Sequence, residues 1–241
     1  MPLKPYKPTV PSYIRMYSAR DDKKSTYTLH PKTKIPCPKC KTPLPTQLPT
    51  CPEQKCGYIA PVSSDLGADY FSLFALPGVR DGEGSSRNAF SIDPRELRGR
   101  FLQMQKVCHP DRWAQKGEDE AQIAVNQSAL LNKAYQTLLS PRLRGEYILS
   151  HHGIDITEMD NMDREQELMM QVMEAREELE SAEGEEVKAL MEANAERVEK
   201  VTAELEDAIG REDWAQAKRS VIQLRYWESF KRAGQGMEVD H

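Results

Sequence analysis

Apolar residues recur at spacings of three and four along most of the chain after residue 93, a pattern typical of helices that bury one face. One such stripe lies between residues 97 and 108, and another between residues 123 and 138. Three more follow between residues 163 and 233. With no comparable alternating pattern typical of strands, the sequence predicts an all-α fold.

The first two stripes predict a helical hairpin. Asp93-Pro94 offers a cap and a proline at the first helical position. Pro110 ends this first helix, because proline lacks an N–H and clashes with the preceding turn. Ser140-Pro141 then begins a last short helix that ends at Gly153. The residues expected to pack between the two helices are Leu97, Phe101, Met104 and Cys108 on one side and Ile123, Leu130, Ala134, Tyr135 and Leu138 on the other.

The last three stripes predict an antiparallel three-helix bundle, since Gly184 and Gly210 mark two short connections. Beyond Gly234 we expect a loose polar tail. The three stripes are Leu168, Val172, Ala175 and Leu179; then Val187, Leu190, Met191, Val198, Val201, Leu205 and Ile209; then Trp214, Ala217, Val221 and Leu224.

Residues 1–36 carry six prolines, four of them spaced every three residues from Pro2 to Pro11, and no apolar period, which indicates an irregular or disordered segment. The first twenty residues hold four bases and no acid. That bias fits either a mitochondrial targeting segment or a basic disordered tail. A second loop is expected at the Gly- and Ser-rich stretch before Asp93.

Four of the five cysteines lie in residues 37–60 as two pairs around a ten-residue, turn-rich loop. Thiolates at this spacing are typical of a structural zinc ribbon, in which four sulfurs leave no open position for catalysis. Gly57 follows the second pair, as such a turn requires, although the second gap is four residues long. Disulfides or incidental cysteines are the alternative. The predicted metal ligands are Cys37, Cys40, Cys51 and Cys56.

Charge narrows the possible partners. The net charge is −5, but residues 160 to 210 are heavily acidic, and phosphate would repel that half of the chain. A zinc-dependent nucleic-acid module is the one alternative here, with Lys39, Lys41 and Lys55 but little aromatic content. No apolar run approaches the roughly 20 residues that a membrane span needs. We expect neither nucleic acid nor membrane as a partner.

The hairpin bend holds His109-Pro110-Asp111, exposed between two helices. Upstream, Arg95, Arg98 and Lys106 share a face, with Leu102 between them. A catalytic His–Asp pair would need a nucleophile and a third orienting group, and the sequence offers neither.

This tripeptide, with NQSALLNKAYQTLLSPRLRGEYIL after it, resembles the J domains of HscB-type co-chaperones. The resemblance implies a protein that is not itself an enzyme but activates the ATPase of a DnaK-type chaperone. Positive side chains would face an acidic surface of that chaperone, and the tripeptide would contact the seam between its ATPase domain and its linker. The implied chaperone-binding residues are Arg95, Arg98, Arg100, Lys106, His109, Pro110, Asp111 and Arg112.

The methionines of the first bundle helix lie beside its core stripe. Their pattern alone fits either an exposed docking patch or a wide core packed on two sides. MMQVMEAREELESAE and QLRYWESF are similar to the C-terminal domain of the HscB family, which delivers an iron–sulfur scaffold protein to a specialised chaperone. The implied scaffold-binding residues are Met169, Met170, Met173, Glu174, Glu177 and Tyr226.

Together these features predict four units: a targeting or disordered segment (1–36), a zinc-binding segment (37–60), a J domain (69–152) and a scaffold-binding bundle (160–233). The resemblance implies a mitochondrial matrix protein that promotes cluster transfer, since animal members also carry a four-cysteine segment. The four-residue gap after Cys51 departs from their pattern. A general J-domain co-chaperone for unfolded clients is the alternative function.

Overall fold

The computed structural model describes residues 35–53, 55–62, 69–76, 89–156 and 162–237. Across these ranges the regular structure is helical, with two isolated antiparallel bridges and no strand. The prediction of an all-α fold is therefore confirmed. The expected targeting segment falls almost wholly outside the described residues, and so does most of the Gly- and Ser-rich loop before Asp93.

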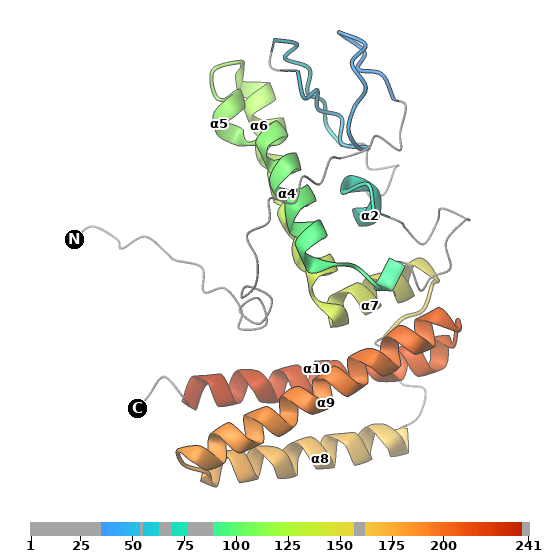
Figure 1. The fold of residues 1–241 in the computed structure, drawn as a ribbon, viewed down its shortest axis with the longest axis vertical. Helices are drawn as coiled ribbons and strands as arrows, with labels where there is room; N and C mark the ends of the chain where they lie inside the picture. Colours follow the sequence, from blue (N-terminus) through green and yellow to red (C-terminus); the bar gives the residue numbers. More distant parts are fainter. Residues whose placement is uncertain (1–34, 54, 63–68, 77–88, 157–161, 238–241) are drawn as a thin grey trace, which may run out of the picture.

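The predicted hairpin consists of α4 (Pro94–Cys108) and α6 (Glu118–Leu139), which pack side by side (Figure 1). Asp93 caps α4 as expected, because its carboxylate accepts a hydrogen bond from the Arg95 N–H at 2.8 Å. Ala134 and Leu138 are fully buried as predicted, and the half-buried Leu130 and Tyr135 pack on the same core. Gln127 and Leu131 are buried as well, whereas Ile123 packs on a separate small cluster.

Two shorter helices complete this part of the molecule. We call its described residues, 69–76 and 89–156, the J arm. Before the hairpin, α2 (Tyr70–Leu73) packs against α6. After it, α7 (Pro141–His151) is capped by Ser140, whose hydroxyl accepts from the Leu143 N–H at 3.3 Å. Gly153 follows with a positive φ of 72°, the left-handed conformation that commonly ends a helix.

The C-terminal helices are α8 (Met162–Ser181), α9 (Glu185–Gly210) and α10 (Trp214–Met237). They form the predicted bundle, and Gly184, with φ of 55°, makes the first turn. Val172, Ala175 and Leu179 are buried against Trp227 and Phe230. The expectation of a loose tail after Gly234 is wrong as far as Met237, because α10 continues to that residue.

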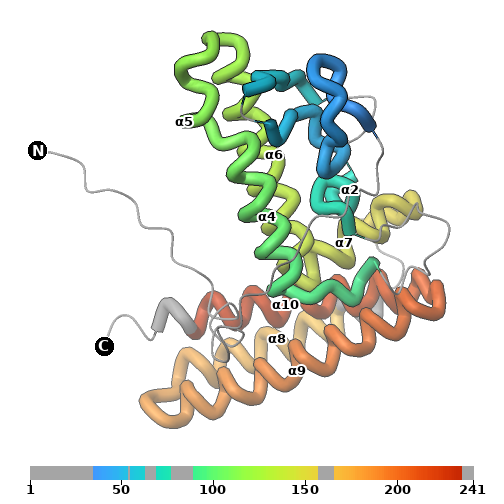
Figure 2. The backbone as a smooth tube through the Cα atoms, turned by 45° about the horizontal axis from the view of Figure 1, so that its top comes forward, coloured from blue at the N-terminus to red at the C-terminus, as the bar shows by residue number. Residues whose placement is uncertain are grey.

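The J arm and the bundle meet at a corner where α7 lies on α9 and α10 (Figure 2). One continuous apolar core crosses this joint, since the cluster holding Leu138 and Ile148 also holds Leu205 and Val221. Gly145 permits the close approach: a Cβ there would lie 2.9 Å from side-chain carbons of both bundle residues. The two units predicted from sequence thus share one core.

Polar contacts reinforce the joint beside that core. Arg142 on α7 donates to Glu228 on α10 at 2.6 Å and also pairs with Glu146. These partners raise the pKa of Arg142 despite the opposing effect of its burial. The guanidinium therefore stays charged, and it ties the bundle to the J arm.

Candidate functional site

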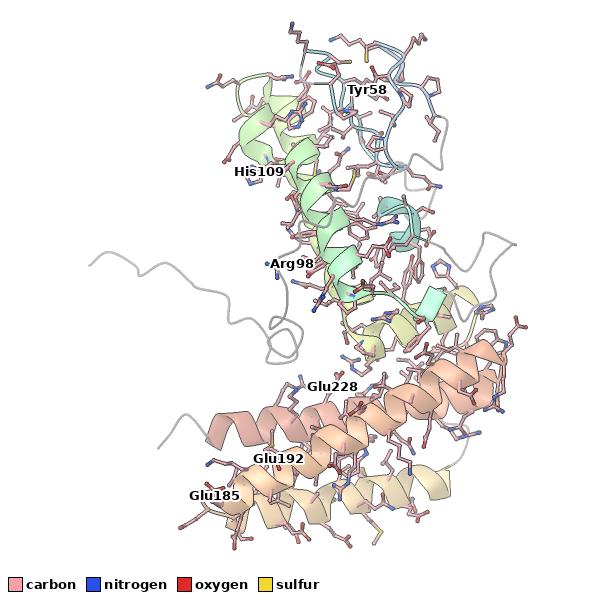
Figure 3. All side chains as sticks on the ribbon, viewed as in Figure 1. Tyr58, Arg98, His109, Glu185, Glu192 and Glu228 are labelled. Carbon is pink, nitrogen blue, oxygen red and sulfur yellow. The ribbon has the colours of Figure 1, made fainter. Side chains whose placement is uncertain are left out.

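His109, Pro110 and Asp111 do not form a simple bend. Pro110 is the first residue of a one-turn helix, α5 (Pro110–Trp113), and His109 is its cap. The imidazole Nδ1 accepts from the Asp111 N–H at 3.3 Å and lies 3.5 Å from the Asp111 carboxylate. Both side chains are exposed, by 54% and 91% respectively. A small helical turn thus holds the exposed imidazole of His109, labelled in Figure 3, next to an exposed carboxylate.

Trp113, which the sequence analysis did not single out, anchors this turn. Its ring is fully buried, and its indole N–H donates to the carbonyl of Val107 at 3.1 Å, near the end of α4. The signal available in the sequence was a tryptophan two positions after an exposed acid. A tryptophan ring at that point favours a buried position, because burying an aromatic side chain typically removes about 150–250 Å² of its surface from water.

The basic face of α4 forms as predicted for Arg95, Arg98 and Lys106, which are all exposed. Leu102, 48% exposed, lies among them. Beyond His109, Arg112 is half-buried rather than free, and it donates to the carbonyls of Lys106 and Pro52.

Arg100 does not belong to this face. Its guanidinium turns inward, where it donates to the carbonyls of Phe74 and Ala75, at the end of α2, and pairs with Glu96 at 2.5 Å. The reason is helical geometry, since a residue two positions after Arg98 is rotated by about 200° around the helix. Arg100 caps α2 and is occupied within the J arm.

The four predicted metal ligands come together. The Sγ atoms of Cys37 and Cys56 lie 3.6 Å apart, those of Cys40 and Cys51 lie 3.5 Å apart, and all four lie within 4.8 Å of one another. These separations are too long for disulfides and near the roughly 3.8 Å that a tetrahedral site implies for zinc–sulfur bonds of about 2.3 Å. The donor set and its geometry fit a zinc ion.

Each cysteine pair belongs to a matching turn. The Cys37 N–H donates to the Thr42 carbonyl, and the Cys51 N–H donates to the Tyr58 carbonyl. The residue after each pair has a left-handed backbone: Lys41 with φ of 64° and Gly57 with φ of 62°. The four-residue second gap therefore still closes into a turn like the first.

The cysteine side chains differ in their environments. Burial raises the pKa of Cys51 to about 12, whereas the hydrogen bond between Cys40 and Thr42 lowers the pKa of Cys40 to about 6. A buried thiolate needs a cation close by, because its charge is costly outside water. A divalent ion at the centre of the four sulfurs would supply that charge.

The predicted docking face lies on α8, across the bundle from the J arm (Figure 1). Met169, Met170 and Met173 are 46%, 62% and 55% exposed, and Glu174 and Glu177 are exposed beside them. The alternative of a wide core, or of packing against the J arm, is wrong for these three methionines. We call Met169, Met170 and Met173 the methionine face.

Tyr226 lies on α10, next to α8. It is half-buried and packs on the core that α8 covers. Next to it, Arg176 on α8 donates to the Ser229 hydroxyl at 3.0 Å, and that hydroxyl donates to the Tyr226 carbonyl at 2.7 Å. The structure thus brings Tyr226 to the edge of α8.

Residues 164–233 match the family described as the HSCB C-terminal oligomerisation domain. The structure of the chaperone HscB from Vibrio cholerae is 31% identical, with a TM-score of 0.60; the match covers 71% of this chain and 98% of that one. The chain belongs to the HscB family.

Human HscB, described as a co-chaperone, is a second relative of known structure. It is 28% identical with a TM-score of 0.68, and the match covers 86% of this chain and 100% of the human one. Residues 69–241 alone make up a smaller share of this chain than the 86% that the match covers. The match to the human protein therefore extends to residues before the J arm. The match to the Vibrio protein covers a smaller share of this chain.

Membership makes this protein a co-chaperone of iron–sulfur cluster biogenesis, in a family whose members are not themselves enzymes. Among the helices of the described ranges, none is long and apolar enough to span a bilayer.

Proposed function

We propose that this protein joins a DnaK-type chaperone to an iron–sulfur scaffold protein and stimulates the chaperone's ATPase. The observation that carries the proposal is the placement of two unlike exposed sites on two units that share one apolar core. His109 and Asp111 are exposed at α5, which lies at the end of the J arm away from the bundle, and the methionine face belongs to α8, on the side of the bundle away from the J arm (Figure 1).

At the first site, the basic face of α4 would meet an acidic surface of the chaperone. Charge complementarity of this kind mainly raises the association rate and sets the orientation of the two proteins. His109, Pro110 and Asp111 would then contact the seam between the chaperone's ATPase domain and its linker. ATP and the groups that hydrolyse it belong to the chaperone. Arg95, Arg98, Lys106 and Arg112 supply the positive charge, while Arg100 serves inside the J arm.

At the second site, the methionine face would hold the scaffold protein, with Glu174, Glu177 and Tyr226 at its edges. Methionine suits this task because its flexible, polarisable side chain adapts to the shape of a partner. Binding both partners on one chain raises their effective concentration near each other. Hydrolysis would trap the scaffold on the chaperone and favour transfer of its cluster.

The four cysteines would hold one structural zinc ion. Four thiolate ligands close the coordination shell, so the ion would stabilise residues 37–60 and leave no position for substrate. The mitochondrial matrix is the compartment we propose. The four bases and the lack of acids in residues 1–20 support that assignment, because this bias is typical of mitochondrial targeting segments.

Single-turnover ATP hydrolysis by a purified mitochondrial DnaK-type chaperone tests the proposal. We expect this protein to accelerate ATP hydrolysis by the chaperone. The scaffold protein should accelerate hydrolysis further, but only when this protein is present. If the scaffold adds nothing while a permanently unfolded client does, the chain is a general co-chaperone for unfolded proteins. If this protein does not accelerate ATP hydrolysis by the chaperone, with or without the scaffold protein, the proposal is wrong.

A further inference from the structure

The helix that carries the exposed tripeptide is too short to be stable alone. Four residues make a single turn, and forming the first turn of a helix is unfavourable because several backbone angles are fixed for one hydrogen bond. Helix α5 must therefore be held by its surroundings. Helices α4 and α6 supply part of that support, and the cysteine segment, residues 37–60, supplies the rest.

The first contact from the cysteine segment is apolar. Ile59 forms a small buried cluster with Trp113 and Ala124, which Ile123 flanks. Ile59 is 9% exposed and Trp113 is fully buried. Ile59 thus covers part of the ring that anchors α5, two positions after Asp111.

The second contact is polar and reaches the residue next to the tripeptide. Arg112 donates to the carbonyl of Pro52, which follows Cys51 directly, at 3.2 Å. Lys116, just beyond α5, lies over the Trp113 ring at 4.7 Å. Its ammonium also lies near Gly57, where a Cβ would approach it to 3.3 Å. The second cysteine turn therefore touches α5 at Arg112 and the segment just after α5 at Lys116.

The third contact fixes the cysteine segment to α6. The buried amide of Gln127 accepts from the Thr50 hydroxyl at 2.5 Å and donates to the Ala60 carbonyl at 2.8 Å. Thr50 and Ile59 are partners in an antiparallel bridge, and they enclose Cys51 and Cys56 between them. A metal that closes this turn thus also fixes the position of Ile59.

We propose that the cysteine segment is a brace for α5, so that metal binding at the four cysteines sets how firmly His109 and Asp111 are presented to the chaperone. The inference rests on the proposed function for its chaperone and extends it to residues outside the J domain. Ile59 and Gln127 are positioning residues. They act through Trp113 and α5, and neither contacts the tripeptide.

Hydrogen exchange on the full-length, zinc-loaded chain tests the brace without any chaperone. The reporters are the N–H groups of Arg112 and Ala114, which donate to the carbonyls of His109 and Pro110. We expect Ile59→Ala to accelerate their exchange at least fivefold while one zinc per chain is retained. Val62→Ala is the matched control, because Val62 packs on the main core of the J arm instead. Equal exchange in Ile59→Ala and wild type, with zinc retained, overturns the proposal.

A second variant keeps the test decisive if Ile59→Ala loses its zinc. Gln127→Ala removes both hydrogen bonds from the α6 side and leaves residues 37–60 unchanged. We expect the same faster exchange at α5, and a chaperone concentration for half-maximal stimulation about fivefold higher than for wild type. Faster exchange with unchanged stimulation overturns the link between brace and chaperone. Failure of wild type to stimulate at all would refute the proposed function instead, and the exchange result would still decide the brace.

Discussion

The two exposed sites of this protein are built in opposite ways. At the tip of the J arm, two polar side chains stand on one helical turn, and buried residues from several segments fix that turn. On α8, three flexible methionines lie on a long helix that needs only its own core stripe for support. A site of the first kind depends on the exact position of a few polar groups, so changing one side chain can abolish its function. A site of the second kind depends on area and weakens gradually.

The largest expected effect comes from Asp111→Asn. The change removes one charge from a side chain that is 91% exposed. Because so exposed a side chain contributes little to packing, the fold should be unaffected. We expect stimulation of the chaperone's ATPase to fall more than tenfold, measured in single-turnover hydrolysis. Affinity for the scaffold protein, measured by calorimetry, should match wild type, and retained stimulation would contradict the J-domain assignment.

Next in size is loss of the metal. With Cys37→Ser and Cys40→Ser together, we expect the zinc content to drop from about one per chain to none, by elemental analysis. Removal of a structural zinc withdraws binding free energy that contributes directly to folding. Thermal unfolding should show a lowered midpoint for the J arm. Wild-type protein purified without any metal would refute the zinc site.

The methionine face should respond more mildly. Met173→Ser replaces a 55% exposed thioether with a small polar group, and we expect scaffold affinity to fall about tenfold, which is about 1.4 kcal/mol. Tyr226→Ala should act in the same direction. Val125→Ser is a matched control on α6, because Val125 is 45% exposed. Unchanged affinity in both bundle variants would favour the general co-chaperone.

The smallest expected effect is a pH dependence of folding stability that comes from Cys108, the residue before His109. Burial raises the pKa of Cys108 to about 11, so the folded state keeps this thiol neutral while the unfolded state ionises at lower pH. The resulting stability is complete at pH 8 and is lost as the pH rises toward 11. We expect wild type to lose about 1 kcal/mol between pH 8 and pH 10 that Cys108→Ala does not lose, measured by urea unfolding. An identical loss in both proteins would contradict this.

Local patterns predicted most of the fold. Asp93, Ser140 and Gly153 end or begin helices through contacts with residues a few positions away, so their roles could be recognised from sequence. The side of α4 on which Arg100 lies could also have been derived, since rotation along a helix is regular. The support behind α5 could not, because Ile59 and Trp113 meet only after two distant segments have folded.

Gly145 gives the corner of the molecule an unusual sensitivity. A single added methyl there would press against Leu205 and Val221 at once and push the bundle away from α7. The spacing between the proposed chaperone and the proposed scaffold protein would then change, although every residue assigned to either contact stayed intact. A substitution far from both surfaces could therefore leave each binding step normal and still misalign the handover.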